Sequence, residues 1–340
     1  MPFIKDLLQH KSVSIVGMAK NTGKTTCLNF VIKRLKQEKI NFAVTSIGVD
    51  GEERDILYQT PKPRIELSEN MIFVTSENDF ANIQFPAEIL SISEHSTPLG
   101  KLVTAKAKGN GIAVLSGPSD SICLQKIISE MQKYNVQLTL VDGALSRMSL
   151  ASPAVTDAMI LCTGAACSAQ LQELINKTKY RCKLIDLEQV DNNLQKLLIP
   201  IEEGVWIWND EHDTRQKIGD SLFTFEKERI KLPENLRNIY ISGAVTNNFL
   251  KLISSKKHKN IKLIVRDFTK LFIEPITYNK LLKQGGRINV LQKPKLLAVC
   301  TNPISPEGTR LNPIILREQM EMALQLPVYD IFEEDSRAEF

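Results

Sequence analysis

One short segment, residues 17–26, combines residue types that bind phosphate, and it reads Gly-Met-Ala-Lys-Asn-Thr-Gly-Lys-Thr-Thr. It follows a β-branched run and precedes an amphipathic stretch, so we expect a strand, a loop and a helix in that order. Gly23 lets the backbone approach an anionic oxygen at the positive end of the helix. Lys24 can reach the β- and γ-phosphates of a nucleotide, and the hydroxyl of Thr25 can join a Mg²⁺ shell. The segment therefore predicts a phosphate-binding loop.

The spacing of this segment differs from the common pattern G-x-x-x-x-G-K-[ST]. Five residues separate Gly17 from Gly23, and Met18 stands where the first glycine would be. The alternative is a glycine-containing turn that binds nothing. We favour the phosphate loop because Gly-Lys-Thr-Thr directly follows a β-branched strand and opens a helix.

The remaining residues of the segment have expected roles of their own. Thr26 should lie beside the α-phosphate. Lys20 could reach phosphate across the interface of a homodimer, or it could simply be solvated. Four residues should shape the loop: Gly17, Asn21, Thr22 and Gly23.

Two carboxylates follow apolar strands and are candidates for Mg²⁺ binding and catalysis. Asp142 comes at the end of the apolar run 136–144, and Asp50 follows an earlier buried strand. The carboxyl ends of strands are where α/β sheets bind their ligands. Asp50, more than Asp55, could accept a proton from water or hold Mg²⁺ through water. The alternatives are a solvated turn for Asp50 and an isolated strand-end carboxylate for Asp142. We expect catalysis to depend on Lys24, Asp50 and Asp142.

These side chains need an α/β framework to position them. Strand and helix patterns alternate over residues 1–190, which predicts a mostly parallel, doubly wound nucleotide-binding domain. Short alternating strands and prolines within residues 58–108 predict an insertion or edge hairpins. A new α/β pattern begins beyond about residue 190, so residues 191–340 are expected to form a second, smaller domain. Its polar loop 301–308, after a buried strand, could contact a ligand or be an ordinary loop.

The composition is that of an ordinary globular protein. The 340 residues are 43% hydrophobic and 24% charged, with a formal net charge of +4. A basic stripe is missing, so we expect no nucleic-acid partner. No apolar run approaches the ~20 residues of a membrane span. Six cysteines without a CxxC pair, and a polar N-terminus, indicate a cytoplasmic protein with free thiols.

Three motifs resemble known families. The spacing from Gly17 to Thr25 is similar to that of the dethiobiotin synthetase and cobyric acid synthase group, and residues 141–144 resemble that group's V-[DE]-G-A element. Residues 17–26, 46–52 and 141–147 together look like the KamB-type reactivase subunits that are linked to lysine 5,6-aminomutase.

The second resemblance implies an ATPase subunit that uses ATP and Mg²⁺. It would act with a MutS-like companion ATPase (KamC-type) to release damaged cobalamin from an inactivated lysine 5,6-aminomutase. Two other functions stay open: a synthetase that activates a carboxylate near Asp50 or Lys20, and a nucleotide-gated chaperone for a metal or cofactor. The choice of ATP over GTP rests only on the lack of a guanine-reading N-K-x-D element.

Overall fold

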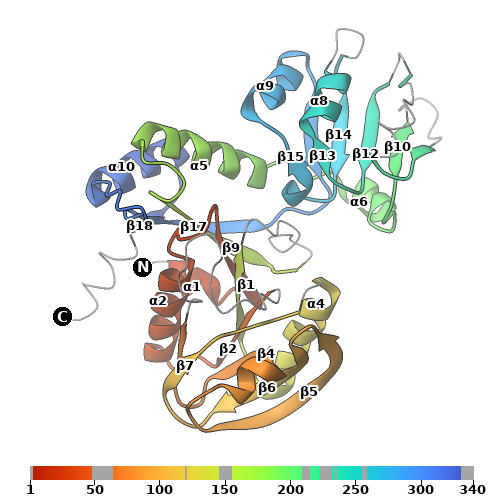
Figure 1. Cartoon of the computed structure of the whole chain (residues 1–340). Coiled ribbons are helices and arrows are strands. Elements are labelled where there is room, and N and C mark those ends of the chain that lie inside the picture. The colour runs from red at the N-terminus through yellow and green to blue at the C-terminus, as the bar shows by residue number, and fades with distance from the viewer. Residues whose placement is uncertain are drawn as a thin grey trace. The chain divides into compact units, whose positions relative to one another are not determined.

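The computed structural model describes residues 3–47, 64–118, 121–144, 155–208, 215–222, 232–233, 236–254 and 259–330. The chain divides into two compact units (Figure 1). Unit 1 contains residues 1–179 together with residues 294–340, and unit 2 contains residues 180–293. Each unit has its own sheet and is described by itself.

Unit 1 is built on a nine-stranded mixed sheet in the order β18-β17-β9-β1-β8-β2-β4-β6-β5. The first seven strands in this order are parallel, and β6 and β5 add to the edge in antiparallel fashion. The expected α/β class with a mostly parallel sheet is confirmed. The strands are β1 (Ser12–Gly17), β2 (Phe42–Ser46), β4 (Ile72–Ser76), β5 (Ala87–Thr97), β6 (Gly100–Ala107), β8 (Leu138–Ala144), β9 (Ala158–Gly164), β17 (Lys295–Asn302) and β18 (Val328–Asp330).

Helices cover both faces of this sheet. Side chains alternate along a strand, so neighbouring residues of β8 pack on opposite sides. Leu140 packs in one cluster with residues of α2, whereas Val141 packs with Leu124 of α4. None of the helices in the described residues is long and apolar enough to cross a membrane. The helices are α1 (Phe3–Leu7), α2 (Lys24–Gln37), α3 (Glu77–Ala81), α4 (Ser121–Glu130), the 3-10 turn η1 (Met131–Tyr134), α5 (Leu171–Ile185) and α10 (Pro313–Leu324).

The region expected as an insertion, 58–108, is described from residue 64 onward. It supplies β4, β5 and β6, which extend one edge of the sheet. The parallel alternation expected over residues 1–190 would make the next apolar run, residues 111–115, another parallel strand. Instead β7 (Gly111–Ala113) pairs antiparallel with β3 (Ile65–Leu67) in a separate two-stranded sheet.

Unit 2 contains a five-stranded sheet in the order β11-β10-β12-β14-β16. Its strands β12, β14 and β16 are parallel, and β10 and β11 are antiparallel. The strands are β10 (Val205–Trp208), β11 (Gln216–Gly219), β12 (Asn238–Ile241), β14 (Lys262–Val265) and β16 (Arg287–Val290). The other elements are α6 (Asn192–Leu198), α8 (Asn247–Ile253), α9 (Pro275–Lys283), η3 (Phe268–Lys270) and the short pair β13 (Val245–Thr246) and β15 (Leu271–Phe272).

The C-terminal segment departs from the expected domain boundary. Residues 191–340 were expected to form one domain, but β17 pairs in parallel with β9 and carries β18 at the edge of the first sheet. The physical reason is that β17 is almost entirely buried and needs two strand neighbours. The alternation expected over residues 1–190 would place a strand at residues 182–185. That prediction is wrong, because these residues form the last turns of α5.

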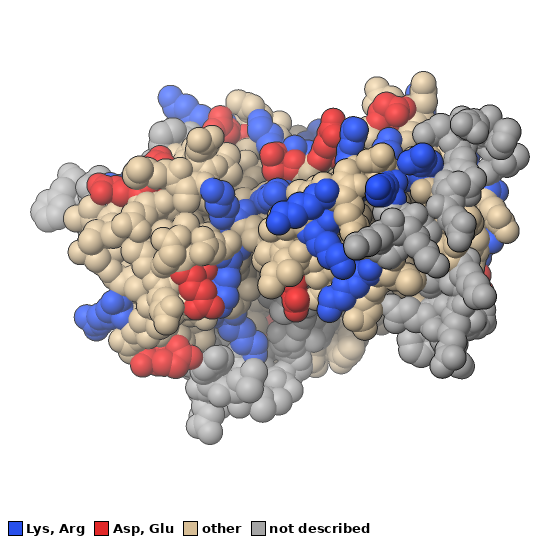
Figure 2. All heavy atoms as spheres, turned by 90° about the horizontal axis from the view of Figure 1, so that it is seen from above, with Lys and Arg blue, Asp and Glu red and all other residues tan. Residues whose placement is uncertain are grey.

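Charges of both signs mix on the surface. On the face shown in Figure 2, lysine and arginine side chains gather near the middle, with aspartate and glutamate side chains among and around them. The absence of a nucleic-acid partner stays a prediction.

Candidate functional site

The segment 17–26 lies at the carboxyl end of β1, inside the sheet of unit 1. β1 is buried along its whole length between β8 and β9. Beyond its last residue, the amide of Met18 donates a hydrogen bond to Cys162 O at 2.9 Å. The chain then turns and enters α2 at Lys24. The sequence therefore forms the expected strand, loop and helix.

Residue 17 must be glycine because two side chains pack closely against its backbone. A Cβ atom built on Gly17 would lie 2.4 Å from Thr22 Oγ1 and 2.8 Å from Cγ and Cδ of Lys24. Both side chains fold over Gly17 to reach one backbone carbonyl. Thr22 Oγ1 and Lys24 Nζ donate hydrogen bonds to Ala19 O at 3.0 and 3.3 Å. These contacts hold the Lys24 ammonium inside the loop.

Two residues of the loop adopt left-handed backbone conformations. Asn21 has φ 59° and Gly23 has φ 86°, which favour asparagine and glycine respectively. The carbonyl of Asn21 accepts a hydrogen bond from Asn302 Nδ2 at 3.0 Å. Asn302 is the last residue of β17, so a distant strand of the sheet holds the loop in place.

The N-terminal end of α2 is open for an anion. Gly23 occupies the N-cap position and provides no side-chain cap, and the first turn contains no acidic residue. The first N–H groups of an α-helix have no partners within the helix and carry the positive end of its dipole. Thr25 and Thr26 lie in this first turn and are half-buried. A phosphate or carboxylate would find donors here.

Asp142 faces the same side of the sheet as α2. Leu138 and Leu140 pack in the cluster that contains the buried face of α2, and the alternation of β8 places Asp142 on that side too. The residue as a whole is half-buried, yet its Oδ1 is out of contact with solvent and has no hydrogen-bond partner within the described part of the chain. Burial raises the pKa of Asp142 to about 6, and the nearby ammonium of Lys24 opposes this rise. An unpaired buried oxygen beside a phosphate-type loop fits a Mg²⁺-bound water or the ion itself.

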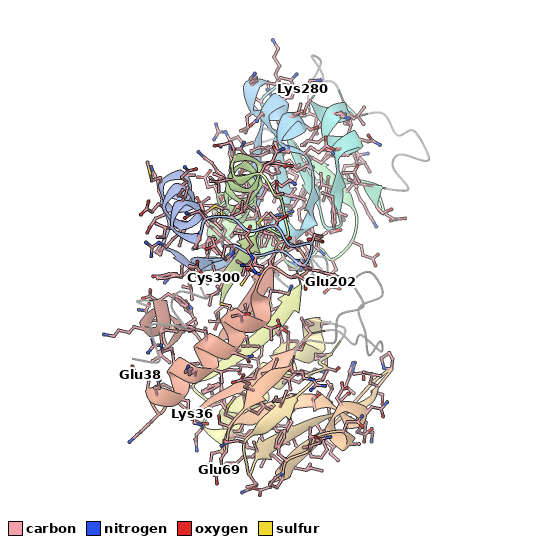
Figure 3. The ribbon with its side chains drawn as sticks, turned by 60° about the vertical axis from the view of Figure 1, so that its left-hand side comes forward. Lys36, Glu38, Glu69, Glu202, Lys280 and Cys300 are labelled. Atoms are coloured by element: carbon pink, nitrogen blue, oxygen red, sulfur yellow. The ribbon has the colours of Figure 1, made fainter. Side chains whose placement is uncertain are left out.

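A cluster of three thiols lies beneath the loop, and it was not anticipated from the sequence. Cys27 is in the first turns of α2, and its Sγ lies 3.6 Å from Sγ of Cys300. Cys162 pairs in register with both Gly17 and Cys300. Hydrogen bonds from Cys27 and Cys300 hold the pKa of the Cys162 thiol well below its usual range, and Lys24 contributes in the same direction. Figure 3 shows Cys300 beside the N-terminal end of α2, with Lys36 and Glu38 at the opposite end.

This cluster is a packing contact rather than a metal centre. Among the described residues, no group of three or more histidine, cysteine, aspartate or glutamate side chains is arranged to hold a metal ion. The spacing of the cysteines in sequence carries no signal, because Cys27 lies in α2 whereas Cys162 and Cys300 lie on strands that meet only through the order of the sheet.

The remaining residues predicted for the site are Lys20, Asp50 and Asp55. Lys20 is exposed on the loop. Asp50 and Asp55 lie outside the described residues. At the amino-terminal end of β1, Asp157 accepts hydrogen bonds from the amides of Lys11 and Ser12 at 2.9 and 3.1 Å. It therefore aligns the start of β1.

The assembled site joins a cation, an uncapped helix end and a buried carboxylate. Lys24 and the N-terminus of α2 supply positive charge, and Asp142 supplies negative charge within reach of Lys24. This combination suits an anion that brings its own divalent cation. Comparison of the chain with known protein families, with curated proteins and with solved structures finds no match.

Proposed function

We propose that this protein binds a nucleoside triphosphate together with Mg²⁺ at residues 17–26 and hydrolyses it, with ATP as the nucleotide. The observation that carries the proposal is that Lys24, folded over Gly17, lies near enough to Asp142 to lower its pKa, while the buried Oδ1 of Asp142 has no hydrogen-bond partner among the described residues. A turn that binds nothing would not need a buried carboxylate without a hydrogen-bond partner, since such a group is costly.

Each residue has a role in this proposal. The loop backbone and the Lys24 ammonium bind the β- and γ-phosphates, and the N–H groups of the first turn of α2 bind the phosphate oxygens beside Thr26. The Thr25 hydroxyl and Asp142 hold Mg²⁺, which neutralises charge on the phosphates. Asp50 orients or deprotonates the attacking water, a role that rests on its place in the sequence. The fold we propose is a doubly wound phosphate-loop NTPase sheet.

The partners we propose come from the resemblance of three motifs to the reactivase family. In this proposal, hydrolysis at Lys24 switches the loops around the nucleotide between two states. A MutS-like companion ATPase couples this switch to the release of damaged cobalamin from lysine 5,6-aminomutase.

The first experiment measures nucleotide binding by calorimetry in the presence of Mg²⁺. ATP and GTP are titrated into the wild-type chain and into Lys24→Ala and Lys36→Ala. Lys36 is an exposed lysine at the other end of the same helix and is the matched control. We expect Lys24→Ala to abolish binding without changing the thermal unfolding curve, and Lys36→Ala to bind normally. Unchanged affinity in Lys24→Ala would contradict the site.

The second experiment measures ATP hydrolysis alone, with an inactivated cobalamin-dependent aminomutase and its companion ATPase, and with small carboxylic acids. Hydrolysis that rises with the mutase and restores its activity supports the reactivase. Hydrolysis that responds only to a carboxylic acid identifies a synthetase instead. The reactivase and the synthetase need the same nucleotide site. This experiment therefore tests the proposed partner separately from the assignment of the nucleotide site.

A further inference from the structure

Unit 2 contains a polar pocket that the proposed nucleotide site does not use. It has a volume of about 420 Å³ and lies at the amino-terminal edge of the parallel strands β12, β14 and β16. We propose that this pocket binds a small organic anion, carrying a carboxylate or phosphate group and at least one N–H or O–H donor. The proposal is independent of nucleotide binding.

The floor of the pocket is a row of three side chains on adjacent strands. Asn238 pairs in register with Lys262, and Lys262 pairs with Arg287, so all three lie on the same face of the sheet. Asn238 is buried and its Nδ2 donates a hydrogen bond to Trp208 O at 3.3 Å. Lys262 and Arg287 therefore bring two positive charges to the floor of the pocket. Arg237 adds a third.

The strongest sign of a ligand is Asn289. It lies two residues beyond Arg287 on β16, hence on the same face, and only 5% of it is exposed. Its Nδ2 donates a hydrogen bond to Glu188 O at 3.2 Å, which sets the orientation of the amide. Its Oδ1 is buried, and none of the residues that the structure describes forms a hydrogen bond with it. A buried acceptor of this kind normally has a donor, which a ligand in the pocket would supply.

The acidic residues of the pocket do not cancel its positive charge. The carboxylate of Asp191 caps α6 by accepting hydrogen bonds from the amides of Asn193 and Leu194, both at 3.0 Å. The bond from Leu194 is the main reason why the pKa of Asp191 lies below its usual range, and Lys262 adds a smaller effect. Glu188 is exposed. The pocket is thus lined by two acidic residues and three basic residues, so an anionic ligand is favoured.

The rim of the pocket is shaped before any ligand binds. Gly285 has φ 78°, and a Cβ atom there would lie 2.0 Å from Asn260 Oδ1. The two loops can therefore meet at the rim only because residue 285 is glycine. None of the described lining residues is aromatic, so nothing is placed to stack on a nucleobase. The volume falls in the lower part of the range for small-molecule sites.

The test uses the full-length chain in a Lys24→Ala background, so that the phosphate loop does not bind the probes. Glycerol 3-phosphate, O-phospho-L-serine, citrate and methyl phosphate are titrated by calorimetry. We expect at least one probe to bind, and Arg287→Gln to weaken that binding by at least tenfold. Lys283→Gln, which removes an exposed cation of the same unit outside the pocket, should leave it unchanged.

Two further readouts test the geometry. Methyl phosphate dianion has no donor, so glycerol 3-phosphate should bind more tightly than methyl phosphate. Asn289→Leu should abolish that difference. The proposal is overturned if no probe binds, if Arg287→Gln binds as the parent does, or if Lys283→Gln weakens binding equally. None of these results bears on the nucleotide site.

Discussion

The side chain of Asn302 donates a hydrogen bond to the backbone carbonyl of Asn21 at 3.0 Å, joining residues that are 281 positions apart. Asn21 sits in the left-handed region in the middle of the loop, and Asn302 ends β17. The structure brings Asn302 close because β17 pairs with β9, whose last residue, Gly164, leaves no room for a Cβ against the Asn302 backbone. The C-terminal part of the chain thus takes part in shaping the candidate nucleotide site.

Replacing Asn302 tests this link. Asn302→Ala removes the hydrogen bond to Asn21 O and also the one that Asn302 Oδ1 accepts from the amide of Ile304 at 3.0 Å. The bond to the loop contributes about 0.5–1.5 kcal/mol, so we expect ATP affinity to fall by roughly two- to tenfold. Calorimetry with Mg²⁺ and ATP measures the change. Asn312→Ala is the control, because Asn312 caps α10 through the amide of Ile315 at 3.1 Å. It should lower the melting temperature and leave affinity alone; equal affinities in both variants would show that Asn302 does not position the loop.

Gly17 gives a steric test of the loop. Gly17→Ala places a methyl group against Thr22 and Lys24, so the two side chains must move away from Ala19 O. Displacement of a binding group by about 1 Å is enough to weaken binding by roughly tenfold or more.

The control for this variant is Gly243→Ala, since no atom of the described residues lies within 4 Å of a Cβ at Gly243. Fluorescence titration with a labelled ATP analogue compares the two proteins, and circular dichroism confirms their fold. If Gly17→Ala binds as tightly as Gly243→Ala, the packing of Lys24 over Gly17 is irrelevant to binding.

The raised pKa of Asp142 predicts that the free energy of unfolding depends on pH. With its pKa raised to about 6 from 3.8, the native state holds a proton that the unfolded state has lost between these pH values. The free energy of unfolding therefore falls as pH rises from about 4 to about 6 and stays low above pH 6. The loss is of the order of 3 kcal/mol, because each pKa unit of difference corresponds to about 1.4 kcal/mol. Chemical denaturation of the nucleotide-free protein from pH 4 to pH 8 measures it.

Asp142→Asn should remove this contribution and behave in opposite ways in two assays. The nucleotide-free variant should be more stable than the wild type at pH 8, because no buried charge remains. Its affinity for Mg²⁺ and ATP should fall, because a metal ligand is lost. Asp220→Asn, at an exposed acid in unit 2, is the control and should change neither. A variant that is destabilised at pH 8 would show that Asp142 is a structural group rather than a site held ready for a cation.

Local signals in the sequence determined the parts of the site that lie close together along the chain. The β-branched run, the glycines and Gly-Lys-Thr-Thr specify strand, loop and helix through backbone preferences that act over a few residues. Asp142 could also be chosen, since a carboxylate near the end of an apolar strand is visible in sequence. The mostly parallel sheet followed from the same alternation of strands and helices.

Tertiary structure alone decided how distant segments meet. The order of the sheet puts β17 next to β9, and this places Asn302 against the loop and Cys300 against Cys27. The row of Asn238, Lys262 and Arg287 in unit 2 likewise arises from strand register. Strand pairing depends on which faces become buried together, and the gain in burial does not fall off with separation along the chain. No local pattern encodes such neighbours, so the sequence could single out the loop at residues 17–26 but not the residues that hold it in place.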